Sequence, residues 1–355
     1  MTTFRIYGPV GENDSLSRVA AGMADGLRAC GKDVSFFDLR SVLDDDDGLT
    51  EGYDADIGIY TGPLSYLSVM ARRGQHKQRL VCIFPNSTWL PPEVMVDAAR
   101  TCTGILAATE WGARVLREHS LGLPVMKWRL GVDEAFAPSP GELVIYPDGL
   151  PIWNVLHLSS TRMGRKGTGV LIGAWALAQA NVWIPRSAEL DLVLSGDEEA
   201  AKRTIEHESN HFGVEANVKL LPRMNLSPAD MASLYRRSDL LAQPSRAEGF
   251  GLCPLEARSC GVPVCATSCT GHSEHMWKGL PGVVTIEHGE EAAIDDGPGA
   301  LAPTVAISDV ASALWCAYDH REELEYWAHV GSARVREEWS WKEAAWRFLC
   351  DEIGE

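Results

Sequence analysis

The stretch from residue 240 to residue 267 predicts a strand, a loop, a short helix and a second strand in immediate succession. The apolar run LLAQPS is typical of a buried strand, and the breaker-rich RAEGFG after it is a loop. LCPLEARSC is expected to be helical because Pro254 falls in its first turn, where the missing N–H costs little, and because Gly261 can end the helix in a left-handed conformation. VPVCAT begins the next strand. Such a unit is the building block of a parallel sheet, so the chain is expected to be α/β.

The unit carries two carboxylates, Glu248 in its loop and Glu256 in its helix. A loop that leaves the carboxyl end of a parallel strand lies where open α/β sheets bind ligands. Its glycines let backbone N–H groups approach a ligand closely, and the start of a helix favours an anion, so the loop suits a phosphate group. Glu256 can accept hydrogen bonds from sugar hydroxyls. The alternative is a capped surface helix with two solvated glutamates, because short glycine motifs are weak signals by themselves.

The alternation of strands and helices occurs twice along the 355 residues, a length typical of roughly two domains. The first round begins with the strand FRIYGP and ends near RLGVDEAFAPSPGE (129–142), whose proline and glycine content is typical of a linker. Its first loop has two glycines but lacks the G-x-G-x-x-G fingerprint, so no nicotinamide cofactor is expected. The second round begins with NVLHLSS and includes a helix for which Ser227 is the expected N-cap. We therefore predict two Rossmann-like domains that face a cleft, residues 1–137 and 138–335.

Composition predicts a cytoplasmic protein. No apolar run approaches the roughly 20 residues that span a bilayer, and the first residues lack the basic start and apolar stretch of a signal peptide. The nine cysteines are odd in number, scattered, and without a C-x-x-C pair, which favours free thiols in a reducing compartment. Four of them lie between residues 253 and 269, but the predicted helix and strand would direct their side chains differently, so no metal site is expected.

The net charge of −17 argues against binding to nucleic acid or to an anionic membrane by the surface as a whole. One local exception is the basic segment ARRGQHKQR (71–79). It is either a solvated helix end that leads into the strand LVCIF or a contact for an anionic acceptor. The residues that would make this contact are Arg72, Arg73, Lys77 and Arg79.

A second loop is expected to form one site together with the glycine-rich loop. TRMGRKG (161–167) follows the predicted strand NVLHLSS and holds Arg162, Arg165 and Lys166. If both strands lie in one parallel sheet, both loops lie along its carboxyl edge. Arginine and lysine pair with diphosphate, while the other loop offers glycine amides and carboxylates, and Glu256 would pair with ribose hydroxyls. Together the loops predict a site for a nucleoside diphosphate.

The segments SSTRMGRKG, LVLSG, LSPADMASLYRRSDLLAQPSRAEGFGLCPLEARSCGVPV and TGHSEH carry a family pattern. With its glutamates separated by seven residues, this pattern resembles the family-four retaining glycosyltransferases of the GT-B fold. LPVMKWRLGVDEAFAP looks like the segment that ends the first domain in that family. WSWKEAAWRFL (339–349) looks like its terminal helix, so residues 336–355 are expected to cross back to the first domain. The resemblance is strong over the second half and weak over residues 1–120.

The resemblance implies roles for individual residues. Arg162 and Lys166 would hold the donor diphosphate and the charge that develops on the leaving group, and Arg165 could share this role because the spacing is one residue shorter than in the common pattern. Glu248 would orient the donor sugar or phosphate. The further residues implied to contact the donor are Gly8, Gly11, Arg165, Arg223, Met224, Gly249, Phe250, Gly251, Leu252 and Glu256. The family's first-domain histidine has no clear equivalent, and FPNSTW (84–89) offers Asn86 and Ser87 in its place.

The function implied by the resemblance is transfer of a hexose, with retention, from a nucleoside-diphosphate sugar resembling UDP-glucose. Positioned cations and helix amides would stabilise the leaving diphosphate without a metal, and no cofactor is expected. The nucleophile stays unassigned. The acceptor is a glycan, a small molecule, a protein or a hydroxymethylated DNA base. The alternative is a non-catalytic protein that binds nucleotide sugars through a glycosyltransferase fold.

Overall fold

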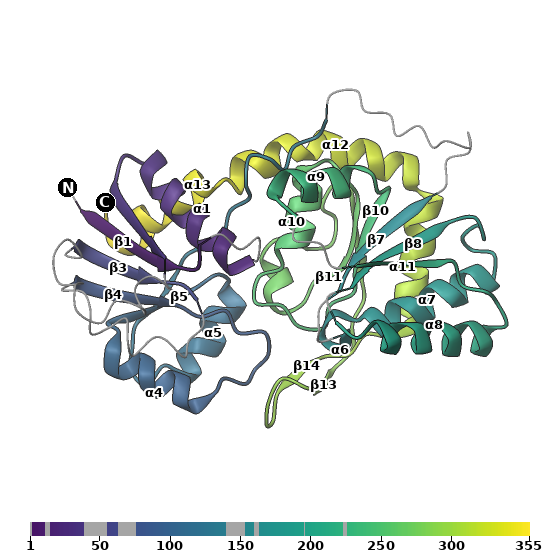
Figure 1. Ribbon diagram of the computed structural model, residues 1–355, viewed down its shortest axis with the longest axis horizontal. Coiled ribbons are helices and arrows are strands. Elements are labelled where there is room, and N and C mark those ends of the chain that lie inside the picture. The colour runs from purple at the N-terminus through teal and green to yellow at the C-terminus, as the bar shows by residue number, and fades with distance from the viewer. Residues whose placement is uncertain are drawn as a thin grey trace. The chain divides into compact units, whose positions relative to one another are not determined.

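The computed structural model describes residues 2–10, 15–38, 55–62, 76–139, 153–159, 163–194, 196–222 and 226–355. The chain forms two compact units, each built around one sheet (Figure 1). The first unit comprises Met1–Asp133, Gly297–Gly299 and Glu337–Glu355, and the second comprises Glu134–Asp296 and Ala300–Arg336.

The first unit holds a six-stranded parallel sheet in the order β2-β1-β3-β4-β5-β6. Ile6 in its centre lies opposite Phe36 on one neighbouring strand and Ile59 on the other. Apolar strands with buried side chains on both faces are typical of a parallel sheet covered by helices. The strands are β1 (Thr3–Gly8), β2 (Asp33–Asp38), β3 (Ala55–Tyr60), β4 (His76–Cys82), β5 (Gly104–Ala107) and β6 (Val125–Lys127), and the helices are α1 (Ser15–Ala29), α4 (Pro92–Thr101) and α5 (Glu110–His119).

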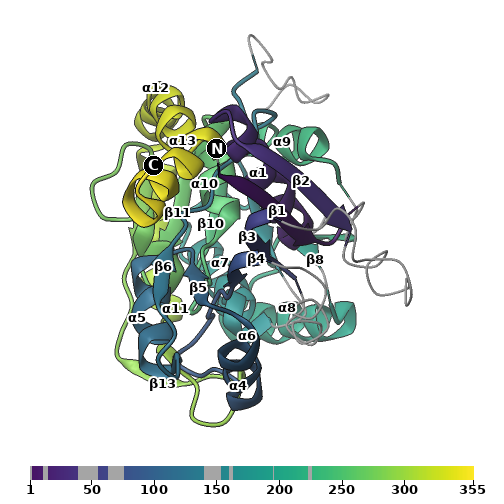
Figure 2. The ribbon, with the colours of Figure 1, turned by 90° about the vertical axis from the view of Figure 1, so that its left-hand side faces the viewer.

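The end of the chain belongs to this first unit. Helix α13 (Trp341–Phe348), followed by the π-helical turn η3 (Leu349–Ile353), lies against α1 (Figures 1 and 2). A Cβ atom on Gly22 of α1 would overlap the Trp341 ring, so the absence of a side chain lets the two helices approach closely. Phe348 stacks on the buried Trp128, with ring centroids 4.3 Å apart.

The second unit holds a six-stranded parallel sheet in the order β12-β11-β10-β7-β8-β9. Its strands are β7 (Asn154–Leu158), β8 (Glu189–Leu194), β9 (Val218–Pro222), β10 (Leu240–Gln243), β11 (Val264–Thr267) and β12 (Val283–Ile286). Its helices are α6 (Met163–Lys166), α7 (Thr168–Ala180), α8 (Glu198–Phe212), α9 (Pro228–Arg236), α10 (Leu252–Ser259), η2 (Thr270–Glu274), α11 (Ile307–Asp319) and α12 (Arg321–Glu338). The strands β13 (Glu291–Ala293) and β14 (Leu301–Pro303) form a separate antiparallel hairpin.

Two apolar cores lie on the two faces of this second sheet. One contains Trp175 of α7, whose ring stacks on Trp153 with centroids 6.0 Å apart, together with residues of α11. The other contains Tyr235 of α9 and residues of α10. Helices on both faces of a parallel sheet confirm the predicted α/β class.

Strand order places the two predicted loops together. β10 pairs with β7, and Leu241 lies opposite Leu156, so the loops after these strands leave the same edge of the sheet. The helix caps are as predicted, since Ser227 accepts a hydrogen bond from the Asp230 N–H and Gly261 has a φ of 79°. One local prediction was wrong. TRMGRKG was expected to be a loop throughout, but Met163–Lys166 form a helical turn that leads into α7.

Candidate functional site

The two loops at the carboxyl edge of the second sheet are locked together by backbone contacts. Arg246 N donates to the carbonyl oxygen of Arg165 over 2.9 Å. Gly167 has a φ of 69°, and a Cβ atom there would overlap the Pro244 carbonyl. Only glycine fits this position without strain, because the conformation is left-handed and the neighbouring backbone leaves no space for a side chain.

The contact between the loops brings three of the predicted residues into one ionic cluster. Glu248 Oε1 lies 2.6 Å from Lys166 Nζ, and Glu248 Oε2 lies 3.0 Å from Arg165 Nη1. Arg165 Nη1 also donates to the Ala247 carbonyl over 2.7 Å. All three side chains are largely buried, with 8% to 13% of each exposed.

Burial raises the pKa of the Glu248 carboxyl, but the charges of Lys166 and Arg165 lower it more, so the pKa lies well below its ordinary value. Glu248 is therefore a carboxylate at neutral pH. Two cations share this one carboxylate, which leaves the cluster with a local excess of positive charge. Buried cations that share one carboxylate can accept a second anion.

The start of helix α10 lies beside this cluster along the chain. Its N-cap is Gly251, with a φ of 87°, and no side chain caps the first turn. The first amides of a helix point out of its N-terminus and carry a partial positive charge, which suits an anion. Gly249, Phe250 and Leu252, also predicted to contact the donor, are the neighbours of Gly251 in this loop.

Glu256 lies inside the unit rather than at its surface. Only 2% of the residue is exposed, and Tyr235 Oη donates to its Oε2 over 2.8 Å. Since only 6% of Glu248 is exposed as well, the alternative of two solvated glutamates on a surface helix was wrong. Binding of ribose by Glu256 stays a prediction, and Tyr235 would share the carboxylate with the ligand.

A third segment at the same edge was missed as a source of functional residues. The loop after β11 and the turn η2 pack against the glycine-rich loop, and a Cβ atom on Gly271 would overlap the backbone of Glu248, Gly249 and Phe250. Thr270, with a φ of 47°, accepts from Glu248 N over 2.9 Å, and Gly271 N donates to the Glu248 carbonyl over 2.8 Å. His275 Nε2 donates to the Phe250 carbonyl over 2.8 Å. The signal was present, since TGHSEH begins three residues after the end of the predicted strand VPVCAT.

Two buried histidines, His157 and His272, lie within electrostatic range of the ionic cluster. A Cβ atom on Gly251 would overlap the His272 ring, so this ring is packed directly on the loop. Burial lowers the pKa of His272 to about 4, although Glu248 opposes the shift. Burial also lowers the pKa of His157 on β7 to about 4. Both rings are therefore neutral at pH 7.

Gly8, Lys77 and Arg79, three predicted residues of the first unit that the structure describes, have structural partners. Gly8 ends β1, and a Cβ atom there would overlap Ala20 of α1. Lys77 pairs with Asp56 over 2.5 Å, and Arg79 Nε donates to the Thr101 carbonyl over 2.8 Å. Residues from His76 onward form β4, so the expected helix end does not extend through this part of the basic segment. Of the FPNSTW residues, Ser87 is buried.

Six predicted residues lie outside the described ranges. They are Gly11, Arg72, Arg73, Arg162, Arg223 and Met224.

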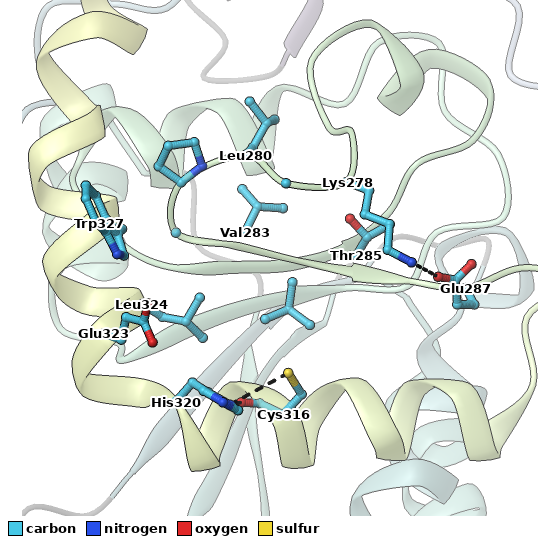
Figure 3. A pocket seen from close by; sticks show the side chains of 14 residues that line it. Lys278, Leu280, Val283, Thr285, Glu287, Cys316, His320, Glu323, Leu324 and Trp327 are labelled. Carbon is cyan, nitrogen blue, oxygen red and sulfur yellow. Dashed lines mark hydrogen bonds and ion pairs between the residues drawn. The ribbon is translucent and has the colours of Figure 1, made fainter.

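A separate groove lies at the edge strand of the second unit. It encloses about 590 Å³ between β12, the end of α11 and the start of α12 (Figure 3). The ring of Trp327 stands at one end, and Lys278 pairs with Glu287 over 3.0 Å at the other. None of the residues predicted for the donor site lines this groove.

Metal-binding and membrane-spanning features are both absent from the described residues. No group of three or more histidine, cysteine or carboxylate side chains among them is placed to hold a metal ion. None of their helices combines the length and the apolar character needed to cross a membrane.

Comparison with known proteins gives matches to glycosyltransferases. Residues 154–314 match the family model for glycosyl transferases group 1. The D-inositol 3-phosphate glycosyltransferase of Gordonia bronchialis is 35% identical over 128 residues, which are 36% of this chain and 26% of that protein. The enzyme of the same name from Rhodococcus erythropolis is 32% identical over 134 residues, 38% of this chain and 28% of that protein. The alignments thus cover little more than a quarter of these relatives.

Solved structures match over nearly the whole chain. Anabaena HepE, in complex with UDP and glucose, has a TM-score of 0.70 at 17% identity and covers 100% of both chains. Sucrose-phosphate synthase from Thermosynechococcus elongatus has a TM-score of 0.70 at 14% identity, covering 98% of this chain and 97% of the other. These findings confirm the predicted resemblance to glycosyltransferases and the GT-B fold class.

Proposed function

We propose that this protein is a retaining hexosyltransferase that takes its sugar from a nucleoside-diphosphate sugar bound by the second unit. The observation that carries the proposal is the buried cluster of Arg165, Lys166 and Glu248 beside the N-terminus of α10. The match of residues 154–314 to the glycosyltransferase family model covers the same loops.

The reaction requires stabilisation of a leaving diphosphate as the bond to the sugar breaks. Lys166 and Arg165 would turn from Glu248 toward the phosphates, since an anion with two charges competes well for two cations. The α10 amides would bind the same group. Charges positioned before the reaction begins lower its barrier without further rearrangement, and we propose that they act here without a metal.

Release of its cations would leave Glu248 free to accept hydrogen bonds from hydroxyls of the transferred sugar. Arg162 would add a third cation, and Arg223 and Met224 would border the base. These roles rest on the family resemblance.

The donor is proposed to be UDP-glucose or a close analogue, which the UDP and glucose in the HepE complex support. The acceptor hydroxyl belongs to a glycan, a small molecule, a protein or a modified DNA base. Arg72 and Arg73 are the proposed contacts for a charged acceptor, whereas Lys77 and Arg79 already have partners within the first unit. We propose a cytoplasmic location, because all nine cysteines are free.

Binding of nucleotide is the first test. With a chelator present, UDP, GDP or ADP at about 100 times its dissociation constant should stabilise the protein by about 2.7 kcal/mol and raise its melting temperature. Lys166→Met should reduce this shift. The control Lys202→Met should not, because Lys202 pairs with Glu198 and Glu199 on the surface of α8. No shift with any of the three nucleotides would reject a nucleotide site.

Turnover separates the proposed enzyme from a non-catalytic nucleotide-sugar-binding protein. The protein should release nucleotide slowly from its donor and faster with an acceptor, and mass spectrometry of an acceptor panel should find the product. Lys166→Ala should lower kcat by about 10²–10³, the cost of removing one group that stabilises charge in the transition state. A changed KM with an unchanged kcat would make Lys166 a simple binding residue.

A further inference from the structure

His272 has a buried nitrogen that lacks a partner. The residue is fully buried, and its Nδ1 lies 3.2 Å from the Thr267 carbonyl oxygen. A carbonyl only accepts, so Nδ1 carries the hydrogen of the neutral ring and Nε2 carries the lone pair. Nε2 is shielded from solvent and has no hydrogen-bond partner among the residues that the structure describes.

An unsatisfied buried acceptor is costly and therefore rare in native proteins. His157, a fully buried histidine on β7, shows the usual arrangement. His157 Nδ1 donates to the Ala242 carbonyl over 2.8 Å, and its Nε2 accepts from the Thr168 hydroxyl over 3.0 Å. His272 has the first of these two bonds and lacks the second.

The position of the ring indicates where its missing partner comes from. Nε2 is one of the two ring atoms that a Cβ on Gly251 would overlap, so this edge of the imidazole adjoins the N-cap of α10. The ring also lies within electrostatic range of Glu248 and Lys166. The lone pair is thus next to the groups to which we assign the donor.

The chemistry of the lone pair limits which group of a ligand can pair with Nε2. A neutral imidazole nitrogen accepts a hydrogen, whereas ionised phosphates, the carboxylate of Glu248 and backbone carbonyls can only accept. The sugar parts of a nucleotide sugar provide hydroxyl donors. We propose that Nε2 of His272 accepts a hydrogen bond from a hydroxyl group of the bound donor and makes the site selective for that hydroxyl.

This inference rests on the proposed function and assigns His272 a role in specificity. The hydroxyl belongs either to the transferred sugar or to the ribose. A site built to pair with a hydroxyl discriminates against a ligand that lacks it, because the protein atom is then left unpaired.

Calorimetry with the full-length protein provides the test. The ligands are UDP, 2′-deoxy-UDP, 3′-deoxy-UDP, UDP-glucose and its 2-, 3-, 4- and 6-deoxy analogues. We expect the parent protein to bind one or more deoxy ligands roughly 3- to 10-fold more weakly than their hydroxylated counterparts, the effect of one neutral hydrogen bond. Glu248 and Glu256 are also proposed to bind hydroxyls, so the hydroxyl that pairs with His272 is the one whose discrimination disappears in His272→Asn.

Substitution then links the selectivity to the ring. An asparagine amide reaches the position of Nδ1 but not that of Nε2, so His272→Asn should bind one of these deoxy ligands and its counterpart with equal affinity. Selectivity at the other hydroxyls should not change. His272→Gln, which reaches toward Nε2, should retain part of the discrimination, and His207→Asn on the exposed face of α8 is the control.

A purely structural histidine would behave differently. His272→Asn would then weaken the binding of all ligands by one common factor. The affinity ratios between deoxy and hydroxylated ligands would stay those of the parent, which would overturn the inference. A parent protein that shows less than twofold discrimination against every deoxy ligand would overturn it as well, and this needs no variant. Failure of UDP and UDP-glucose to bind at all would instead reject the proposed function together with the inference.

Discussion

At the scale of single residues, the second unit keeps charged and neutral polar groups buried side by side. Glu248 is a carboxylate because two cations lie within 3.0 Å of it. His157 and His272 are neutral because burial lowers the pKa of each to about 4. Burial of a group is tolerated where its charge is paired or absent, so each of these residues is stable in one protonation state.

The buried histidines predict an acid sensitivity of folding. The pKa of a histidine in an unfolded chain is about 6.5, and burial lowers the pKa of His157 in the folded protein to about 4. Between these values the unfolded chain binds more protons, so the free energy of unfolding should fall as the pH falls from 6.5 to 4. The loss is on the order of 3 kcal/mol for such a residue. Urea unfolding at a series of pH values gives the free energy of unfolding as a function of pH. The slope of this free energy against pH should be smaller in His157→Gln than in the parent.

The exposed His207 provides the control for this measurement. Its side chain is 75% exposed on α8, so His207→Gln should have the slope of the parent. An equal slope in His157→Gln and the parent would mean that His157 does not contribute to the pH dependence.

At the scale of elements, the position of α10 depends on a glycine at its N-cap. Gly251 is left-handed, and it also lies against the His272 ring. Gly213 at the C-terminal end of α8 has a similar φ of 66°, but no atom lies within 4 Å of the place where its Cβ would be. The two glycines therefore separate the cost of the backbone conformation from the cost of the overlap.

Gly251→Ala should be more destabilising than Gly213→Ala. Gly213→Ala should lower the free energy of unfolding by about 1–2 kcal/mol, the cost of the left-handed conformation alone. Gly251→Ala should lower it by about 1–3 kcal/mol more, because the His272 ring must shift to make room for the new Cβ atom. Denaturant unfolding gives both values, and calorimetry should show weaker nucleotide binding only for Gly251→Ala. Equal losses in the two variants would contradict the tight contact between Gly251 and His272.

At the scale of the whole molecule, the last residues of the chain complete the unit that contains the first. Trp341 of α13 lies against Gly22 of α1, more than three hundred residues earlier in the sequence. The glycine-rich loop and the loop with Arg165 and Lys166, which we propose bind the nucleotide, are by contrast both in the second unit. A defect in the contact between α1 and α13 should therefore affect the stability of the first unit and leave donor binding intact.

Gly22→Ala tests this separation. Alanine normally stabilises a helix by about 1 kcal/mol relative to glycine. At Gly331 of α12 the nearest atom would be 3.7 Å from the new Cβ, so Gly331→Ala should be neutral or stabilising. At Gly22 the new Cβ would overlap the Trp341 ring, so the protein should lose stability in urea while the UDP affinity stays that of the parent. A stabilised Gly22→Ala protein would show that α13 does not pack as described.

The sequence by itself determined the α/β class, the caps at Ser227 and Gly261, and the position of the two loops that hold Lys166, Arg165 and Glu248 at one edge of the sheet. These features follow from local rules, because hydrophobic runs, breakers and caps act within a few residues and the ends of adjacent parallel strands meet at one edge. The helical turn at Met163–Lys166 was missed, since so short an element has no periodicity to detect. The roles of Arg162, Arg223 and Met224 remain predictions.

The tertiary structure alone decided what surrounds the cluster. Burial of Glu256 against Tyr235, and the packing of His272 on Gly251, join segments that only strand order brings together. Solvation and pairing depend on every neighbouring segment at once, whereas a sequence pattern specifies only its own. For this reason two glutamates that were compatible with a solvated surface helix proved to be buried, and a histidine without an assigned role proved to pack against the N-cap of α10.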